Sequence, residues 1–98
     1  MIFINNITYQ ELANFQKKRT LLIDLRPYKE YLNFHIPNSF SIHQLPILPK
    51  DKSIIFICEH GLKAKEYADY YRYYHYDCYY LEGGISLYKT MATQHNFY

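Results

Sequence analysis

The chain of 98 residues is long enough for one hydrophobic core, so we expect a single domain over residues 1–98. Its 11 Lys and Arg residues nearly balance 9 Asp and Glu residues and are scattered, which argues against nucleic acid as a partner. No stretch approaches the roughly 18 apolar residues of a membrane span, the start lacks a signal-peptide pattern, and two cysteines imply no disulfide framework. We therefore expect a cytoplasmic protein that does not bind membranes.

Apolar segments alternate with helical patterns along the whole chain. Thr8 and Glu11 have the spacing of a capping box at the start of a helix. Pro27 fits the first turn of a short helix, which must end near Phe34 because Pro37 disfavours helical geometry in the residue before it. In chain order the pattern predicts a strand over residues 1–4, a helix over about 8–18, a strand over 21–24, a short helix over about 27–34, strands over about 40–42 and 53–57, a helix over about 62–74, a strand over about 78–81 and, after Gly83 and Gly84, a helix over about 86–93.

This alternation of strands and helices indicates crossover connections, and hence an α/β fold with a mainly parallel sheet that carries helices on both faces. In such open sheets ligands bind beyond the carboxyl ends of the strands, and both Asp24, which ends a predicted strand, and Cys58, which directly follows one, lie there. Cys78 instead begins its strand, so the two sulfurs should lie near opposite ends of the sheet. We therefore expect a structural role for Cys78 and no disulfide between the two cysteines.

The 13 tyrosines are densest over residues 67–80, where they are interleaved with basic side chains in a way that is also typical of base-stacking surfaces. We favour a structural interpretation. Ala64, Tyr67, Ala68 and Tyr71 have the spacing of one core-facing helix stripe, in which small alanines allow close approach to a sheet. An exposed tyrosine patch would instead favour a partner-binding surface.

Cys58 is the candidate for a reactive residue because it lies between an apolar run and a glycine-containing loop. Residues 54–57 form the apolar run, Gly61 lies in the loop, and a helical pattern starts just beyond it. Such a loop points successive backbone N–H groups and a helix N-terminus at one spot, which stabilises a nucleophilic thiolate. The alternative is that Cys58 only ends a core strand, as a small buried hydrophobic residue.

Three segments form a recognisable set: Ile23 to Arg26 with Glu30-Tyr31 and His35-Ile36-Pro37, then Cys58 to Lys63, then Leu81 to Ile85. By their order and spacing these segments resemble the rhodanese homology domain, and the resemblance covers nearly the whole chain. It implies a five-stranded, mostly parallel α/β domain without a cofactor. In this family the loop cysteine accepts sulfane sulfur as a persulfide, usually from thiosulfate in assays, and passes it to cyanide or to a thiol of a small molecule or protein. The short cysteine loop looks especially like that of small single-domain thiosulfate sulfurtransferases.

On this resemblance Cys58 is the catalytic nucleophile, and the backbone amides of the residues that follow it form an anion-binding loop. Lys63 would attract an anionic donor, although the family commonly has Arg there; the alternative is a solvated lysine in the first turn of a helix. His60 would orient a donor, but the chemistry requires no proton transfer from it. The loop comprises Glu59, His60, Gly61, Leu62 and Lys63.

Further charged residues surround the predicted site. Glu59 would repel an anionic donor if its carboxylate pointed inward, and we expect it to point to water. Asp24 and Arg26 are expected to support the site. Arg26 should pair with Asp24 or Glu30, because half-buried charges need partners, and this pairing would fix the loop after the second strand. The alternative is that Arg26 receives anions directly.

Three other functions are alternatives to sulfur transfer. Related phosphatases and arsenate reductases have Cys followed by five residues and then Arg, whereas the sixth residue after Cys58 is Ala64 and no arginine occurs between Arg26 and Arg72. A metal site on Cys58 and His60 lacks a second ligand pair with recognisable spacing, so we expect no metal. The second hypothesis is a non-catalytic binding or regulatory module with the same fold, which an ordinary reactivity of Cys58 would favour.

Overall fold

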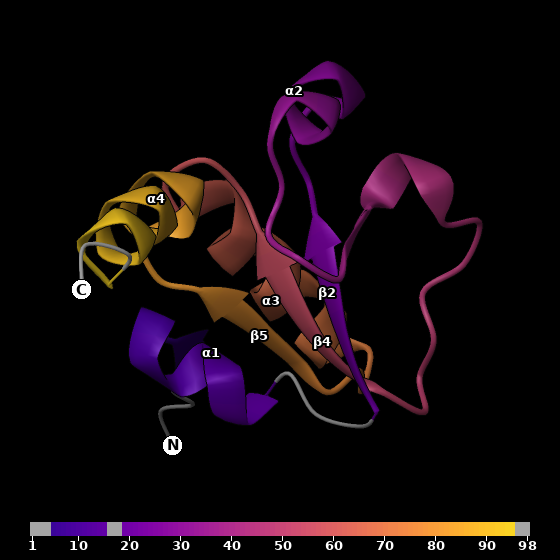
Figure 1. Ribbon diagram of the computed structural model, residues 1–98. Coiled ribbons are helices and arrows are strands. Elements are labelled where there is room, and N and C mark those ends of the chain that lie inside the picture. The colour runs from indigo at the N-terminus through magenta and orange to yellow at the C-terminus, as the bar shows by residue number, and fades with distance from the viewer. Residues whose placement is uncertain (1–4, 16–18, 96–98) are drawn as a thin grey trace.

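Five strands form one parallel sheet in the computed structural model, which describes residues 5–15 and 19–95 (Figure 1). Across the sheet the strands follow the order β1-β5-β4-β2-β3, and each neighbouring pair is parallel. The predicted α/β fold with a mainly parallel five-stranded sheet is confirmed. In chain order the elements are β1 (Asn6–Ile7), α1 (Tyr9–Phe15), β2 (Thr20–Asp24), α2 (Tyr28–Asn33), β3 (Ser39–Ser41), the 3-10 helix η1 (Ile42–Gln44), β4 (Ser53–Ile57), α3 (Leu62–Tyr73), β5 (Cys78–Leu81) and α4 (Gly84–His95).

The central strand β4 is buried on both of its faces. Ile54 and Phe56 pack in the cluster on the face that α3 covers, whereas Ile55 and Ile57 pack on the opposite face with Ile85 of α4 (Figure 1). Successive side chains of a strand point to opposite faces, so a strand between two helical layers must be apolar at every position. This explains why β4 reads in the sequence as a continuous apolar run.

Boundaries near the start and the middle of the chain differ from the prediction. The predicted strand over residues 1–4 lies outside the described residues. Residues 42–44, for which no helix is predicted, form η1 because Ser41 caps it. The Oγ of Ser41 accepts the backbone N–H of His43 at 3.1 Å, and the backbone N–H of Ser41 donates to Gln44 Oε1 at 3.1 Å. These two bonds form a capping box.

Helix α3 packs on the sheet through the predicted stripe of small and aromatic residues. Ala64 and Ala68 are fully buried, and the ring centroids of Tyr67 and Tyr71 each lie 5.7 Å from that of Phe56. The core-facing role of this stripe is confirmed. The helix also presents an aromatic outer side, so a partner-binding surface there stays a prediction. Its exposed members are Tyr70, Tyr73 and Tyr74.

The two cysteines lie near opposite ends of the sheet, as predicted, and both are free. Cys78 pairs in register with Ile54 near the start of β4, whereas Cys58 follows the last residue of that strand. Burial raises the pKa of the Cys78 thiol to about 12, although the charge of Arg72 acts in the opposite direction. Cys78 therefore stays protonated at neutral pH, which agrees with a structural role.

The Cys78 thiol should make stability depend on alkaline pH. The unfolded chain loses this proton near the ordinary thiol pKa of about 8.5, whereas the folded protein keeps it up to a pKa of about 12. Its contribution is complete below about pH 8.5 and is lost as the pH rises, at up to about 1.4 kcal/mol per pH unit. Urea unfolding of the wild type and of Cys78→Ala across this range measures the effect. Equal pH slopes for the two proteins would contradict it.

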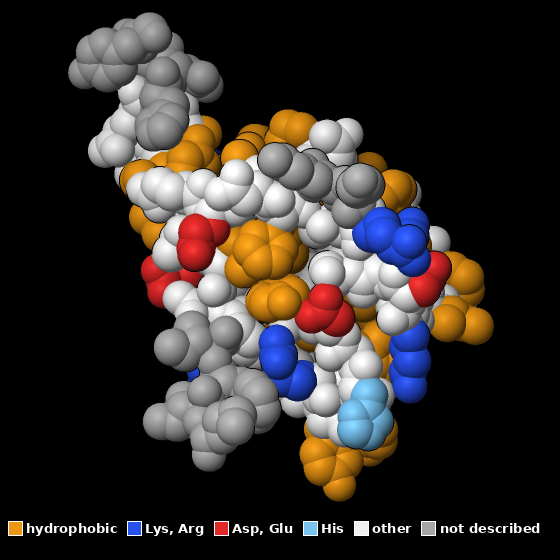
Figure 2. Space-filling view, turned by 90° about the horizontal axis from the view of Figure 1, so that it is seen from below, with side chains coloured by type: hydrophobic (Ala, Val, Ile, Leu, Met, Phe, Trp, Pro, Cys, Tyr) orange, Lys and Arg blue, Asp and Glu red, His pale blue; other side chains and the backbone are white. Residues whose placement is uncertain are grey.

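Charged side chains are spread over the surface. On the face seen in Figure 2, the Lys and Arg side chains lie apart from one another, with acidic, polar and hydrophobic side chains between them. This distribution agrees with the formal net charge of +2, and this face offers no continuous basic surface. None of the helices within residues 5–15 and 19–95 has both the length and the apolar character that a membrane-spanning helix requires.

Candidate functional site

The site centres on Cys58, which directly follows β4. Its Sγ accepts hydrogen bonds from the backbone N–H groups of Gly61, at 3.1 Å, and Ala64, at 3.3 Å. Ala64 lies in the first turn of α3, where backbone N–H groups have no partner within the helix. The loop and the helix N-terminus therefore direct two N–H donors at one sulfur, an arrangement that stabilises negative charge on it.

Gly61 gives the loop the shape that these bonds require. It immediately precedes α3 with a φ of +97°, in the left-handed region that favours glycine. A Cβ at this position would lie 3.2 Å from the backbone nitrogen of Gly83, so the loop could not keep its close contact with the turn before α4. Both observations explain why glycine occupies position 61.

The start of α4 holds the cysteine loop from the other side. The backbone N–H of Ile85 donates to the carbonyl of Cys58 at 2.9 Å, and that of Ser86 donates to the carbonyl of Glu59 at 3.0 Å. The two segments approach this closely because Gly84 has no side chain; a Cβ there would collide with the same two carbonyl oxygens. Helix α4 begins at Gly84, two residues before its predicted start. The backbone N–H groups of its first turn form the hydrogen bonds to the cysteine loop.

Gly84→Ala should destabilise the protein, because the added Cβ meets loop carbonyls that cannot move without losing hydrogen bonds. We expect a loss of about 1–3 kcal/mol in the free energy of unfolding, measured by urea denaturation. Gly83→Ala is the comparison variant, because Gly83 also has a positive φ, of +77°, but its added Cβ would meet side-chain atoms of Leu87, at 2.5 to 3.1 Å, rather than the carbonyls of the cysteine loop. A loss for Gly84→Ala no larger than that for Gly83→Ala would contradict this account.

The side chains of the predicted anion-binding loop lie mostly on its outer side. Within the predicted range 59–63, Gly61 is the residue whose amide contacts the sulfur, and the second amide comes from Ala64, one residue further on. Lys63 belongs to the first turn of α3, and its Nζ lies 5.9 Å from the ring centroid of Tyr67 one turn further along the helix. The sequence prediction missed the contact made by Ala64. Its place in the first turn of a predicted helix, where backbone N–H groups have no partner within the helix, could have indicated it. The exposed loop residues are His60, Leu62 and Lys63.

A buried ion pair braces the loop after β2. Arg26 Nη2 lies 2.9 Å from Asp24 Oδ2, and Arg26 Nε donates to both carboxylate oxygens of Asp24, at 3.1 and 3.2 Å. Arg26 Nη2 also donates to the carbonyl of Phe34 at 2.6 Å. Burial acts to lower the pKa of the Arg26 guanidinium, but the hydrogen bonds and the charge of Asp24 outweigh this effect and raise the pKa above its ordinary value. Of the two predicted partners of Arg26, the structure confirms Asp24.

Glu59 joins this ion pair to the cysteine loop. Its Oε1 lies 3.7 Å from Arg26 Nη1, and its Oε2 accepts the hydroxyl of Ser86 at 2.9 Å. The expectation that this carboxylate simply points to water is therefore wrong, since the side chain is 43% exposed and both of its oxygens have partners. Both partners lie far from Glu59 along the chain, so its neighbours in the sequence gave no sign of them.

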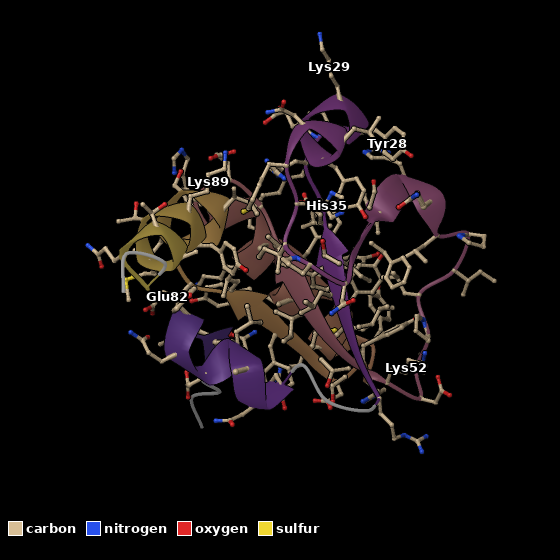
Figure 3. All side chains as sticks on the ribbon, viewed as in Figure 1. Tyr28, Lys29, His35, Lys52, Glu82 and Lys89 are labelled. Carbon is tan, nitrogen blue, oxygen red and sulfur yellow. The ribbon has the colours of Figure 1, made fainter. Side chains whose placement is uncertain are left out.

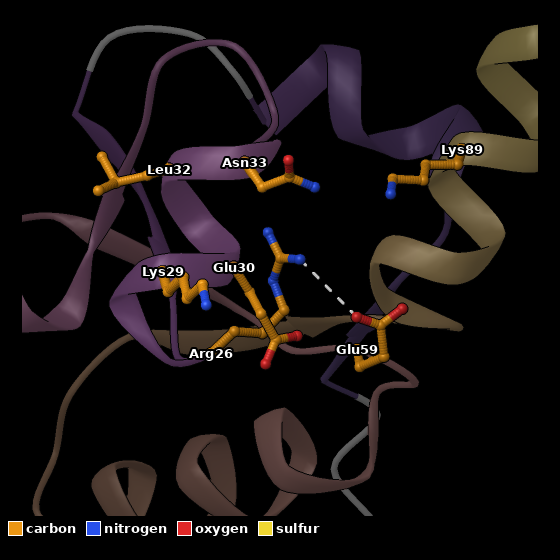
Figure 4. Close-up of a pocket in the computed structure, with 7 residues that line it drawn as sticks. All are labelled: Arg26, Lys29, Glu30, Leu32, Asn33, Glu59 and Lys89. Atoms are coloured by element: carbon orange, nitrogen blue, oxygen red, sulfur yellow. Dashed lines mark ion pairs between the residues drawn. The ribbon is translucent and has the colours of Figure 1, made fainter.

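A cleft of about 560 Å³ lies beside the loop, between α2 and α4 (Figure 4). It borders the loop through Glu59, the residue after Cys58, and through Arg26. Cys58 itself is recessed, with 5% of its surface exposed. The cleft therefore reaches the cysteine loop at Glu59, next to Cys58, which is not itself a lining residue. Its lining includes Arg26, Lys29, Glu30, Asn33, Glu59 and Lys89.

The cleft lies at the end of the sheet where the parallel strands have their carboxyl ends. Lys89 projects from α4 near this end, and Lys29 projects from the outer end of α2, whereas Lys52, just before β4, marks the opposite end (Figure 3). This is the position at which open α/β sheets bind ligands. Sequence reasoning missed Lys29 and Lys89 because only the fold brings their helices to the loop.

A second hollow, of about 440 Å³, lies over the outer side of α3 and is lined by Glu66, Tyr67, Tyr70 and Tyr71. We place the candidate site at Cys58 because two backbone N–H groups converge on its sulfur, a feature that the lining of this hollow lacks. Within the part of the chain that the structure describes, no group of three or more His, Cys, Asp or Glu side chains is arranged to hold a metal ion.

The sequence from residue 8 to residue 91 matches the model of the family described as the rhodanese-like domain. This chain belongs to the rhodanese-like domain family. No curated protein matches it. Three segments of this rhodanese-like domain, which carried the resemblance in the sequence, meet around Cys58 in the structure. One supplies the pair of Asp24 and Arg26, one supplies the cysteine loop, and one supplies Gly84 at the start of α4.

Solved structures share the fold of this rhodanese-like domain at low sequence identity. A rhodanese-related protein from Thermoplasma volcanium has a TM-score of 0.78 and 24% identity, over 89% of this chain and 92% of that chain. A single-domain sulfurtransferase from Saccharomyces cerevisiae has a TM-score of 0.73 and 23% identity, over 92% of each chain. A Rhodopseudomonas palustris protein described as a possible tyrosine phosphatase has a TM-score of 0.77 and 21% identity, over 91% of this chain and 82% of that chain. These likenesses establish the fold.

Proposed function

We propose that this protein is a sulfurtransferase that moves sulfane sulfur from a donor such as thiosulfate to a thiol or cyanide acceptor through a persulfide on Cys58. The observation that carries the proposal is the pair of backbone N–H donors, from Gly61 and Ala64, on the Cys58 sulfur. The acceptor thiol belongs to a small molecule or to a protein. We place the reaction in the cytoplasm, where thiols stay reduced.

The proposed cycle has two displacement steps at sulfur. The Cys58 thiolate attacks the outer sulfur of thiosulfate, the sulfur–sulfur bond of the donor breaks, and sulfite leaves with the electron pair of that bond. A persulfide anion remains on Cys58. An acceptor thiolate or cyanide then attacks the outer sulfur of this persulfide, Cys58 leaves as a thiolate, and cyanide becomes thiocyanate. Neither step needs an oxidant, a reductant or a proton from His60.

The two N–H donors support both steps of this cycle. They stabilise Cys58 as the attacking thiolate and again as the leaving group when the acceptor takes the outer sulfur. Fixed donors act most strongly where water is excluded, and Cys58 is 5% exposed. The compact loop thus suits a group that carries its charge on one or two sulfur atoms.

A phosphatase or arsenate reductase activity fits this loop less well. Those reactions favour an arginine fork around a tetrahedral oxyanion. Here the loop position that would hold the arginine is Ala64, which offers a backbone N–H, and Arg26 is engaged with Asp24 and Glu59. These contacts favour the transfer of a single sulfur atom over phosphoryl transfer.

A non-catalytic binding module is the second candidate function, and the recessed position of Cys58 favours it. The rate of alkylation by iodoacetamide separates the two candidates. The proposed enzyme should react much faster at Cys58 than at Cys78, whose burial raises its pKa to about 12. Equal, slow alkylation of both cysteines would favour the module.

A panel of substrates tests the proposed reaction directly. With thiosulfate and cyanide the wild type should produce thiocyanate, and with p-nitrophenyl phosphate or arsenate it should show no turnover above that of Cys58→Ser. Turnover of the phosphate ester or of arsenate, without thiocyanate formation, would overturn the proposal.

A further inference from the structure

The cleft between α2 and α4 is lined by three basic and two acidic side chains. The charge of one of the three, Arg26, is balanced by Asp24, which is fully buried behind the cleft and lies 2.9 Å from the guanidinium. Two lysines and two carboxylates remain, which leaves no surplus of positive charge to hold a dianion such as thiosulfate. The charged lining residues are Arg26, Lys29, Lys89, Glu30 and Glu59.

Arg26, the cation of the cleft that contacts the cysteine loop through Glu59, is already occupied. Its Nε and Nη2 bind Asp24, and its Nη1 lies 3.7 Å from Glu59 Oε1. The hydroxyl of Ser86 holds the other oxygen of Glu59 at 2.9 Å, which fixes this carboxylate in place. An anionic donor must therefore compete with Glu59 for the guanidinium and approach a negative charge next to Cys58.

Lys89 is the cation that faces the cleft from the other wall. In Figure 4 the Lys89 ammonium and the Asn33 side chain point toward one another across the cleft, with Glu59 and Glu30 below them. Lys29 projects from the outer end of α2 and lies at the rim (Figure 3). The two walls thus offer a cation, from α4, and an amide, from α2, to a carboxylate between them, and Glu30 and Glu59 offer carboxylates to an ammonium group.

We infer that this cleft binds a small zwitterionic persulfide, with an ammonium and a carboxylate group as in an α-amino acid, and that Glu59 selects such donors over thiosulfate. This inference rests on the proposed function. The ligand carboxylate would bind Lys89 and Asn33, and its ammonium would bind Glu59 and Glu30. A volume of about 560 Å³ lies within the range of small-ligand sites and is ample for an amino-acid persulfide.

The sulfur step is the same displacement with a different leaving group. The Cys58 thiolate attacks the outer sulfur of the donor R–S–SH, the donor sulfur–sulfur bond breaks, and the thiolate R–S⁻ leaves with its electron pair. Cys58 then carries the persulfide, protonated or ionised as its surroundings dictate. Sulfur atoms and electrons balance without an oxidant or a reductant, and the ligand thiolate stays in the cleft until it dissociates.

Rates of persulfide formation on the whole protein, followed by intact mass, test the ligand class. The probes are cysteine persulfide, the persulfide of 3-mercaptopropionate, which lacks the ammonium, and the persulfide of cysteamine, which lacks the carboxylate. We expect cysteine persulfide to load Cys58 at least about fivefold faster than either analogue, because each analogue loses one ionic contact. Equal rates for all three persulfides would overturn the inferred ligand class.

Glu59→Gln tests the role of the carboxylate, because the amide keeps the size of the side chain and still accepts the Ser86 hydroxyl. The ratio of the thiosulfate rate to the cysteine persulfide rate should rise at least about fivefold. Lys89→Gln should slow loading by cysteine persulfide by a similar factor. Lys52→Gln removes a lysine at the far end of the sheet and is the matched control, with both rates unchanged.

The outcomes separate this inference from the function on which it rests. If the wild type gains no sulfur from any of the four donors, the proposed sulfurtransferase activity fails. If the wild type gains sulfur but Glu59→Gln leaves the ratio of donor rates unchanged, the inference about Glu59 fails while the proposed activity stands.

Discussion

Replacing Cys58 by serine should lower the rate of thiocyanate formation from thiosulfate and cyanide by at least about a thousandfold. A hydroxyl oxygen cannot take up sulfane sulfur under these conditions, so the first displacement has no nucleophile. Serine is close to cysteine in size, and its oxygen can still accept the N–H groups of Gly61 and Ala64, so the loop should keep its shape. Colorimetric detection of thiocyanate, with kcat compared at saturating thiosulfate, gives the result.

Cys78→Ala is the control for this prediction. Cys78 lies at the start of β5, and its burial raises the pKa of its thiol to about 12, so its removal should leave kcat within about twofold of the wild type. Folding of both variants is checked by circular dichroism. Retention of more than a tenth of the wild-type rate by folded Cys58→Ser would contradict a catalytic role for Cys58.

Asp24→Ala should destabilise the protein by about 3–5 kcal/mol, the usual cost of leaving one charge of a buried pair without its partner. The Arg26 side chain is 6% exposed and that of Asp24 is fully buried, so water cannot replace the lost carboxylate without rearrangement. Three of the guanidinium contacts, as well as the bond from the backbone N–H of Arg26, end on Asp24. Urea denaturation measures the change.

Asp51→Ala is the matched control for this effect. Asp51 is exposed in the connection before β4, so its removal should change the free energy of unfolding by no more than about 0.5 kcal/mol. If Asp24→Ala and Asp51→Ala destabilised the protein equally, the buried ion pair would not brace the loop as described.

Local patterns were sufficient to predict most of the fold. The bounds of β4 and β5 follow from the sequence, because β4 is apolar on both faces and β5 is set between the turn that follows α3 and a glycine pair. The helix η1 also had a signal, since Ser41 and Gln44 have capping-box spacing, but the apolar pattern favoured a strand over about 40–42. Helix α4, after β5, starts earlier than predicted. Gly84 was expected to interrupt the chain before the helix, but it belongs to the helix and packs against the cysteine loop.

The candidate site was predictable where its residues are neighbours in the chain. Cys58 and Gly61 belong to one loop, and Asp24 and Arg26 to another, so spacing alone brings each pair together. Ser86 and Lys89 were missed because they lie on α4, about thirty residues after the cysteine loop, and no short-range pattern links them to it. The position of the Glu59 carboxylate was mispredicted for the same reason, since Arg26 and Ser86 hold it.

The mass of the intact protein after incubation with thiosulfate tests the central claim most directly. The account predicts a gain of about 32 Da, the mass of one sulfur atom, that cyanide removes, that Cys78→Ala retains and that Cys58→Ser lacks. A wild type that gains no sulfur from thiosulfate or from any small persulfide, or a gain that persists in Cys58→Ser, would contradict it.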